Sequence, residues 1–484
     1  MTGGGIPARW LRHPLAVPGL FLLFFVLHLY RITDGPNGFH TWRETDTAMV
    51  AANFFTETGS ILEPRIDVRG AGDGRIGMEF PLYSYWVGFL FHVAGHHHSL
   101  ARLSTVAAAL LLLWLTMAIS RRLSGDRLVA TCTLLAMACS PLVFFYGRKI
   151  QPDIWALTAT TAGFWCLLTA PRGRWSPRFL GFIVLFCLGG LMKPTMLVLG
   201  SAALWVLLRQ EGRRGFGQPR WWVAAALILT PVLLWYRHAR QLNLSLETNY
   251  FYLGGRWDVV LDALSSYRFW QNSFLAWPFE LGTGLLLAPF FLYGLVRLKQ
   301  AGRTGLVLSW AAGCYAGYFI TARHMATPHD YYMLSLTPAL ALVTGEGLAG
   351  FLTRVRTAPV LQMAGMALIL LAMPAAIARV HQRYGPVYDF ADDRRLGDRL
   401  FARGERIAVM DDVPARTLYR LGRKGWRLQP GDHSTLEEIR AARVRWLAVS
   451  ATLGDAGAAF SGGVAFRNRW VTVYRLEPER PPLD

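Results

Sequence analysis

The sequence contains few cysteines, and no pair of them has the spacing of a zinc site or a redox motif. There are five in 484 residues: Cys132, Cys139, Cys166, Cys187 and Cys314. All five lie inside apolar segments, where a thiol behaves as a small hydrophobic side chain. We therefore interpret them as packing residues, which excludes a function built on cysteine.

Acidic residues are scarce relative to basic ones. The chain has 31 Asp and Glu against 50 Lys and Arg, for a net charge of +19. An excess of this size is typical of nucleic-acid binding when it gathers with aromatic residues on one soluble face. Here the basic residues are spread between apolar segments, so we exclude nucleic acid as a partner and interpret the charges as topology signals.

Two processing and symmetry signals are also lacking. No convincing small-residue cleavage site precedes Asp34, so we interpret the N-terminal apolar run as a retained first span rather than a removed signal peptide. The sequence shows no internal repeat of the inverted kind that marks many secondary transporters.

Apolar residues are abundant instead. They make up 53% of the chain, which has 18 Trp, far above a typical soluble domain. A helix needs about 20 mostly apolar residues to cross a bilayer, and fewer where neighbours shield it. The sequence predicts eleven such segments, near 14–31, 99–120, 128–146, 152–170, 179–192, 195–208, 221–238, 282–297, 304–321, 332–350 and 359–379. The fold class is thus a polytopic all-α membrane protein.

The stretch 80–95 resembles a twelfth span, and the positive-inside rule decides against it. With eleven spans the N-terminus and five short loops rich in Arg or Lys lie on the cytoplasmic side, whereas a twelfth span would move most of these clusters outside. We therefore predict that 80–95, which is short, aromatic and begins with Pro81, lies in or dips into the outer interface. The protein is expected in the cytoplasmic (inner) membrane, with its N-terminus inside.

Three substantial pieces then lie outside: 32–98, 239–281 and everything after about 380. We divide the chain into a transmembrane module, 1–379, with the outer loop 32–98, and a small extracytoplasmic α/β domain, 380–484. In the latter we predict strands at Arg406–Met410, Trp446–Ser450 and Trp470–Leu476, and helices at Pro414–Leu421 and Ser434–Ala442. This domain has no cysteine, no glycine-rich phosphate loop and no obvious acid pair, so we interpret it as an accessory lid or recognition domain.

The first outer loop contains two candidate catalytic acids in the segment Thr41-Trp42-Arg43-Glu44-Thr45-Asp46. Thr41 and Glu44 have the spacing of a capping box, which gives Glu44 a structural role at a helix start. Asp46 has no share in that cap, and positions i and i+2 of a helix point about 200° apart. We expect Asp46 to be the catalytic base, the alternative being a favourable interaction of Asp46 with the helix dipole.

A further carboxylate, Glu79, ends the first loop in the segment Gly77-Met78-Glu79-Phe80-Pro81. One interpretation is that it binds a cation or the hydroxyl groups of a sugar. The other is an ion pair with Arg75 or Arg69. The sequence does not decide between them.

Three groups of cations depart from the positive-inside pattern because they fall at outer ends of spans. They are Arg148 and Lys149, followed by Asp153; Lys193; and the segment Arg323-His324-Met325-Ala326-Thr327-Pro328-His329-Asp330-Tyr331-Tyr332. Lipid headgroups are one explanation for each group. A single substrate phosphate explains all three together. Sugar transfer from a polyprenyl phosphate requires a base for the acceptor hydroxyl and cations for the leaving phosphate, and the chain offers both.

At these residues the chain resembles a GT-C membrane glycosyltransferase of the protein O-mannosyltransferase and aminoarabinose lipid A transferase superfamily, over about residues 14–350. The acidic motif of the first outer loop corresponds to Trp42–Ala48, where Arg43 replaces the first acid of the usual pair. A variant W-R-x-x-D-T-A pattern among related bacterial proteins favours Asp46 over Glu44 as the base. Glu79-Phe80-Pro81 resembles the family's Glu-Lys-Pro, with Phe80 in place of the lysine.

Three later motifs also resemble the family. Gln151-Pro152-Asp153 is similar to its second outer acidic motif, Met192-Lys193-Pro194 to its Thr-Lys-Gly turn, and His329–Tyr332 to the tyrosine-bearing loop beside the carrier lipid. The resemblance implies that Arg43, Glu79, Arg148, Lys149, Asp153, Lys193, Arg323, His324, His329, Tyr331 and Tyr332 contribute to substrate or phosphate binding.

The resemblance implies a polyprenyl-phosphate sugar donor and an acceptor outside the cytoplasmic membrane: an envelope glycan, a lipid or a protein. Some relatives use a divalent metal, for which Glu79, His324 and His329 are candidate ligands here, but no compact ligand motif is present, so metal use is unknown. Two other functions stay open. One is a ligase or polymerase acting on undecaprenyl-linked glycans, and the other is a non-catalytic transporter of lipid-linked sugars.

Overall fold

The computed structural model describes residues 6–245, 257–327, 329–387, 390–457 and 463–476. Part of the predicted outer piece 239–281, residues 246–256, therefore lies outside the described residues. The chain forms two compact units. Unit 1 comprises residues 1–32, 102–237 and 252–382, and unit 2 comprises 33–101, 238–251 and 383–484.

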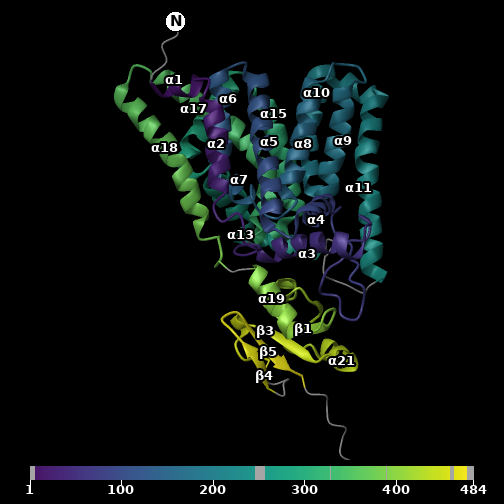
Figure 1. The fold of residues 1–484 in the computed structure, drawn as a ribbon. Helices are drawn as coiled ribbons and strands as arrows, with labels where there is room; N and C mark the ends of the chain where they lie inside the picture. Colours follow the sequence, from purple (N-terminus) through teal and green to yellow (C-terminus); the bar gives the residue numbers. More distant parts are fainter. Residues whose placement is uncertain (1–5, 246–256, 328, 388–389, 458–462, 477–484) are drawn as a thin grey trace, which may run out of the picture. The chain divides into compact units, whose positions relative to one another are not determined.

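All the secondary-structure elements described for unit 1 are helices (Figure 1). Its α-helices are α1 (Ile6–Arg12), α2 (Ala16–His28), α5 (His98–Ser124, from Arg102), α6 (Arg127–Ala138), α7 (Pro141–Tyr146), α8 (Asp153–Thr169), α9 (Pro177–Met192), α10 (Gly200–Glu211), α11 (Pro219–Ser245, to Arg237), α12 (Trp257–Ser265), α13 (Tyr267–Trp270), α14 (Ala288–Gln300), α15 (Thr304–Ile320), α16 (Ala322–Ala326), α17 (Thr337–Arg354) and α18 (Pro359–His381). Tighter or wider turns form η1 (Pro194–Leu199), η2 (Gly212–Gly217), η3 (Gln271–Gly282), η4 (Leu285–Leu287) and η5 (Asp330–Leu336).

Each of the eleven segments predicted as spans contains at least part of a helix. Four helices are long and apolar enough to cross a membrane by length and composition: 98–124, 219–244, 330–354 and 359–381. A fifth span results if the bent pair 267–282 and 285–300 counts as one. Four shorter apolar helices, α2, α6, α9 and α15, accompany them. Helical breaks such as the one between α6 and α7, where Ser140 caps the helix beginning at Pro141, make several predicted spans too short for this length criterion.

Helix α17 is largely enclosed, because fifteen of its eighteen residues are buried. It packs against α6 and α14. Gly347 permits the approach to α14, since a β-carbon there would collide with the carbonyl of Phe290. This close packing holds the segment η5–α17, which carries several candidate site residues, in a fixed position within the unit.

Unit 2 contains the first outer loop and the C-terminal segment. The loop contributes α3 (Thr41–Glu57) and α4 (Leu82–Ala94), which pack against each other. Helix α4 lies within the predicted stretch 80–95, is 13 residues long and groups with the loop rather than with the helices of unit 1. These observations agree with a helix that does not span.

The C-terminal segment forms a five-stranded sheet in the order β2-β1-β3-β5-β4. Its elements are α19 (Phe390–Leu400), β1 (Arg406–Met410), α20 (Arg416–Leu421), β2 (Lys424–Arg427), α21 (His433–Ala441), β3 (Trp446–Ser450), η6 (Ala451–Leu453), β4 (Val464–Arg467) and β5 (Val471–Arg475). Strands β2, β1 and β3 are parallel, and β3, β5 and β4 are antiparallel. The sequence predicted β1 and β3 with their observed bounds but missed β2, β4 and α19.

Successive side chains of a strand point to opposite faces, and both faces of this sheet are covered. On β1, Ile407 and Val409 belong to one buried apolar cluster, and Ala408 and Met410 belong to the other. The outer loop extends the sheet at β2: the amides of Arg69 and Gly70 donate to the carbonyl of Gly425, each over 2.9 Å. The loop and the C-terminal segment are therefore one folded unit.

Candidate functional site

Helix α3 presents the two candidate acids of unit 2. It begins after His40, whose φ of 62° is left-handed and whose side chain makes no capping hydrogen bond. The predicted capping box is therefore wrong: Thr41 is already inside the helix, and its hydroxyl donates backwards to the carbonyl of Gly38. Glu44 thus loses the structural role that the sequence suggested, although it still lies in the first turn, where the helix dipole favours an acid.

Glu44 and Asp46 are both completely buried, at 0% exposure. Burying a carboxylate is costly unless its surroundings compensate for the lost hydration, so two such residues on one turn of helix indicate a specific environment. Their separation by two residues directs the side chains about 200° apart. The two carboxylates consequently face different surroundings, and they are not a paired acid and base.

Arg43 and Glu79 form an ion pair, with side-chain exposures of 10% and 13%. This corrects the partners considered for Glu79, because Arg69 pairs with Glu57 over 2.8 Å and Arg75 with Asp73 over 2.7 Å. The structure thus brings together two predicted site residues that are 36 positions apart. Each side chain neutralises the charge of the other. The ion pair thereby connects the first turn of α3, which contains Arg43, to the segment just before α4, which contains Glu79.

The rest of the loop is attached to α3 through Asn53. Its amide donates to Asp67 Oδ1 over 2.9 Å and to the carbonyl of Arg65 over 3.1 Å. Burial raises the pKa of Asp67, while the Asn53 hydrogen bond and Arg69 lower it. These contacts fix the path of the loop across the face of α3.

In unit 1, Lys193 is the centre of a buried polar cluster. It follows α9 directly and is only 5% exposed. Its Nζ lies 2.7 Å from Asp153 Oδ1 and 4.5 Å and 5.1 Å from the ring centroids of Tyr331 and Tyr332. The three groups predicted for the outer ends of spans therefore meet at one cation, through Asp153 in α8, Lys193 after α9 and the tyrosines of η5.

The histidines of the third motif continue this cluster. His324 stacks on Tyr332 with ring centroids 5.1 Å apart, and the ring of His329 lies 5.2 Å from that of His324. Burial, followed by the charges of Lys193 and Arg323, lowers the pKa of His324 to about 4. His324 is accordingly neutral at physiological pH. Arg323 itself is exposed.

Arg148 and Lys149 are 2% exposed and make different contacts. The guanidinium of Arg148 donates to the carbonyls of Tyr30 and, over 2.6 Å, Arg31, at the end of the first span. Lys149 Nζ lies 4.7 Å from the ring centroid of Phe145. Arg148 thus stabilises the chain path after α2.

Three further residues belong to this region without having been predicted as site residues. Tyr146 donates a hydrogen bond to Asp330, which connects the end of α7 to η5. Gln151 is 2% exposed, yet neither its amide oxygen nor its amide nitrogen has a hydrogen-bond partner in the described structure. A buried amide without a partner is rare and marks a place where a ligand or water supplies the bonds. The sequence could have indicated Gln151 as a site residue, because it lies between the predicted site residues Lys149 and Asp153.

No group of three or more His, Cys, Asp or Glu side chains with the geometry of a metal site occurs among the residues that the structure describes. Of the three candidate ligands, Glu79 pairs with Arg43, while His324 and His329 lie close together in unit 1.

Comparison with known proteins gives a match to one family model and matches to several solved structures. The family model described as dolichyl-phosphate-mannose-protein mannosyltransferase matches residues 79–236, a range that includes Lys149, Asp153 and Lys193. A search among curated proteins finds no significant match.

Solved structures match over nearly the whole chain. ArnT from Cupriavidus metallidurans bound to undecaprenyl phosphate has a TM-score of 0.68 and 12% identity, with 96% of this chain and 98% of that chain covered. The apo state of the same protein has a TM-score of 0.67 and 13% identity, with 95% of this chain and 98% of that chain covered. The oligosaccharyltransferase from Archaeoglobus fulgidus in complex with zinc and sulfate has a TM-score of 0.60 and 11% identity, with 92% of this chain and 69% of that chain covered.

The helical unit, the small C-terminal sheet, the family match and the structural likeness together confirm the expected resemblance: this chain has the fold of the GT-C membrane glycosyltransferases.

Proposed function

We propose that the protein is an inverting glycosyltransferase that moves a sugar from a polyprenyl-phosphate donor to a hydroxyl group of an extracytoplasmic acceptor. The acceptor is a lipid, a polysaccharide or a protein. The enzyme lies in the cytoplasmic membrane with its N-terminus inside and its C-terminal domain outside. The observation that carries the proposal is the buried Lys193 held by Asp153, Tyr331 and Tyr332.

The leaving group requires cations. When the bond between the sugar C1 and the phosphate oxygen breaks, the electron pair stays on the phosphate, which gains one negative charge. Lys193 is the proposed stabiliser of that charge. A fixed cation in a water-poor site is worth several kcal/mol to such a transition state, roughly 3 for one strong donor. Lys149 and Arg323 are proposed as further contacts to the carrier phosphate, and Gln151 supplies an amide with unused hydrogen-bonding capacity.

The acceptor requires a base. Asp46 is the proposed group that takes the hydroxyl proton as the acceptor oxygen bonds to C1, a role typically worth 10²–10⁴ in rate. The Arg43–Glu79 ion pair is proposed to hold α3, and with it Asp46, in the required orientation. Because Glu44 points about 200° away from Asp46, no second carboxylate on this helix serves as a nucleophile beside the base. A single displacement follows, which inverts the anomeric centre.

Likeness to a structure that contains undecaprenyl phosphate supports the choice of donor lipid. The test is binding of undecaprenyl phosphate to the purified full-length protein. We expect Lys193→Met to weaken binding at least tenfold, because a charge-assisted contact is lost. Lys299→Met, at an exposed lysine in the last turn of α14, is the matched control and should bind as the wild type does. Equal affinity of the two variants would contradict the assignment of Lys193.

A product assay separates this function from its alternatives. A glycosyltransferase of this type forms a new glycosidic bond and releases the polyprenyl monophosphate. A ligase or polymerase acting on preassembled glycans releases a polyprenyl pyrophosphate. A transporter forms no new bond.

A further inference from the structure

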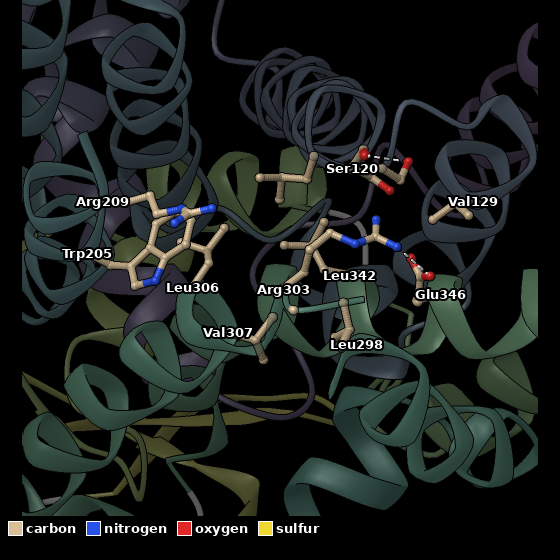
Figure 2. Close-up of a pocket in the computed structure, with 13 residues that line it drawn as sticks. Ser120, Val129, Trp205, Arg209, Leu298, Arg303, Leu306, Val307, Leu342 and Glu346 are labelled. Carbon is tan, nitrogen blue, oxygen red and sulfur yellow. Dashed lines mark hydrogen bonds and ion pairs between the residues drawn. The ribbon is translucent and has the colours of Figure 1, made fainter. Parts of the chain in front are cut away.

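A pocket of about 180 Å³ lies in unit 1, away from Lys193 (Figure 2). It is bordered by the ends of α5, α10 and α14 and by parts of α6, α15 and α17. Lys193 precedes η1 and α10, whereas Arg209 of the pocket is in the last turn of α10. Arg209 lies sixteen positions after Lys193 along η1 and α10, or roughly 25 Å at about 1.5 Å per residue.

The pocket carries an excess of positive charge. Its lining contains two cations, Arg209 and Arg303, and one anion, Glu346. Arg303 Nη2 donates to Glu346 Oε1 over 2.9 Å, and Figure 2 shows the two side chains directed at each other. This pair neutralises Glu346, whose side chain is 4% exposed.

Arg209 is not compensated in this way. In the described part of the chain it has no hydrogen bond or ion pair, and Figure 2 shows it beside Trp205 at one side of the pocket. An arginine is especially suited to phosphate, which its planar fork binds through two hydrogen bonds. The pocket therefore provides one cation for an anionic ligand.

The remaining lining is largely apolar. It includes Leu298, Leu306, Val307 and Leu342, which Figure 2 labels. Such a wall gains nothing from a small hydrated anion, but it does gain from methylene groups that leave water, at about 0.8 kcal/mol each. The volume corresponds to roughly six water molecules, which is enough for a phosphate with its nearest carbons.

We propose that this pocket binds the phosphate headgroup of an anionic lipid, with Arg209 as the main ligand of the phosphate and the apolar side chains against the first methylene groups. The Arg303–Glu346 pair forms the polar wall. This site is separate from the one at Lys193, and it does not depend on the proposed transferase activity.

The experiment measures binding of dioctanoyl phosphatidylglycerol to the full-length protein in detergent by native mass spectrometry. We expect Arg209→Gln to raise the dissociation constant about tenfold, the loss of one charge-assisted contact. Arg213→Gln, at an exposed arginine of η2 outside the pocket, is the matched control and should change it less than twofold. Glu346→Gln should tighten binding, because it frees Arg303 from its ion pair.

Two ligand controls identify the source of the phosphate. Dioctanoylglycerol, which has no phosphate, should bind no better to the wild type than to Arg209→Gln. Inorganic phosphate at the lipid's concentration should not displace the lipid. Unchanged affinity in Arg209→Gln would overturn the site, and displacement by inorganic phosphate would overturn its assignment to a lipid.

Discussion

The two regions with candidate catalytic residues differ in how their charges are held. In unit 1, Lys193 contacts residues of two segments that are far from it in the sequence: Asp153 in α8, and Tyr331 and Tyr332 in η5. In unit 2, Glu44 and Asp46 are neighbours on one helix and are separated by helix geometry alone. The cation site is therefore a product of tertiary packing, whereas the division between the two acids is already set by local structure.

This difference suggests how each region tolerates substitution. In a cluster assembled from distant segments, several residues contribute charge, so the remaining residues partly compensate for the substitution of one of them. A single acid on a helix has no substitute. The predictions below test that contrast, from the largest expected effect to the smallest.

Asp46→Asn should lower the rate of sugar transfer by about 10³-fold or more, because the amide cannot accept the acceptor proton. The change nearly preserves volume, so the protein should still fold and insert. Turnover with saturating donor is the measurement.

Glu44→Gln is the matched control for this variant, since Glu44 is equally buried on the same helix. It should reduce the rate much less. If Glu44→Gln abolished transfer while Asp46→Asn retained it, the roles of the two acids would be exchanged.

Lys193→Met should lower the transfer rate about 10²-fold, corresponding to roughly 3 kcal/mol of lost transition-state stabilisation. Lys193→Met should also destabilise the protein, because it leaves the buried Asp153 carboxylate unpaired. Part of this loss of stability should be recovered in the double variant Lys193→Met/Asp153→Asn. Turnover and thermal unfolding, measured for the single and double variants, separate the chemical effect from the structural one. A double variant no more stable than Lys193→Met would contradict the ion pair.

Breaking the Arg43–Glu79 pair should affect stability. Arg43→Gln or Glu79→Gln alone should destabilise unit 2 by roughly 3 kcal/mol, since each leaves a mostly buried charge without its partner. The double variant should regain most of this loss. A double-mutant cycle on the free energy of unfolding checks the coupling, and strictly additive effects would exclude it.

The smallest effect concerns pH. The folded pKa of His324 is about 4, below the unfolded value near 6.5, so the unfolded state binds more protons between these values. Stability should therefore be constant above about pH 6.5 and fall as the pH drops from 6.5 towards 4.

His324→Gln should remove this part of the acid sensitivity while leaving other titrating groups in place. The difference in melting temperature between the variant and the wild type, followed from pH 8 to 4, measures it. A difference that did not change with pH would show that His324 does not contribute. In unit 2, His96, whose pKa burial lowers to about 3, provides a second histidine for the same comparison.

The sequence predicted much of the architecture because hydrophobicity and charge act locally. Apolar length identified the eleven segments that contain helices, and the distribution of Arg and Lys distinguished 80–95 from the spans. Alternation of apolar residues predicted β1 and β3 with their observed bounds. Strands β2 and β4 were missed because Lys424–Arg427 contains a glycine and two basic residues, and Val464–Arg467 is largely exposed.

Side-chain partners were predicted less well. The capping box of Thr41 and Glu44 has the right spacing, yet the helix begins one residue earlier than that box requires. Arg75 and Arg69 were the candidate partners of Glu79 because they are near in sequence. The chain instead returns to α3, where Glu79 pairs with Arg43. Which groups pair depends on how distant segments approach, and spacing carries no information on that.

The sequence by itself determined that this is a polytopic membrane protein, where its candidate acids and cations occur along the chain, and that Glu44 and Asp46 point apart, since each follows from composition and helical geometry. Only the tertiary structure decided that Lys193 meets Asp153, Tyr331 and Tyr332, that Glu79 binds Arg43, and that the outer loop and the C-terminal sheet form one unit. The physical reason is that these contacts join segments separated by tens to hundreds of residues, and packing, not local pattern, selects them.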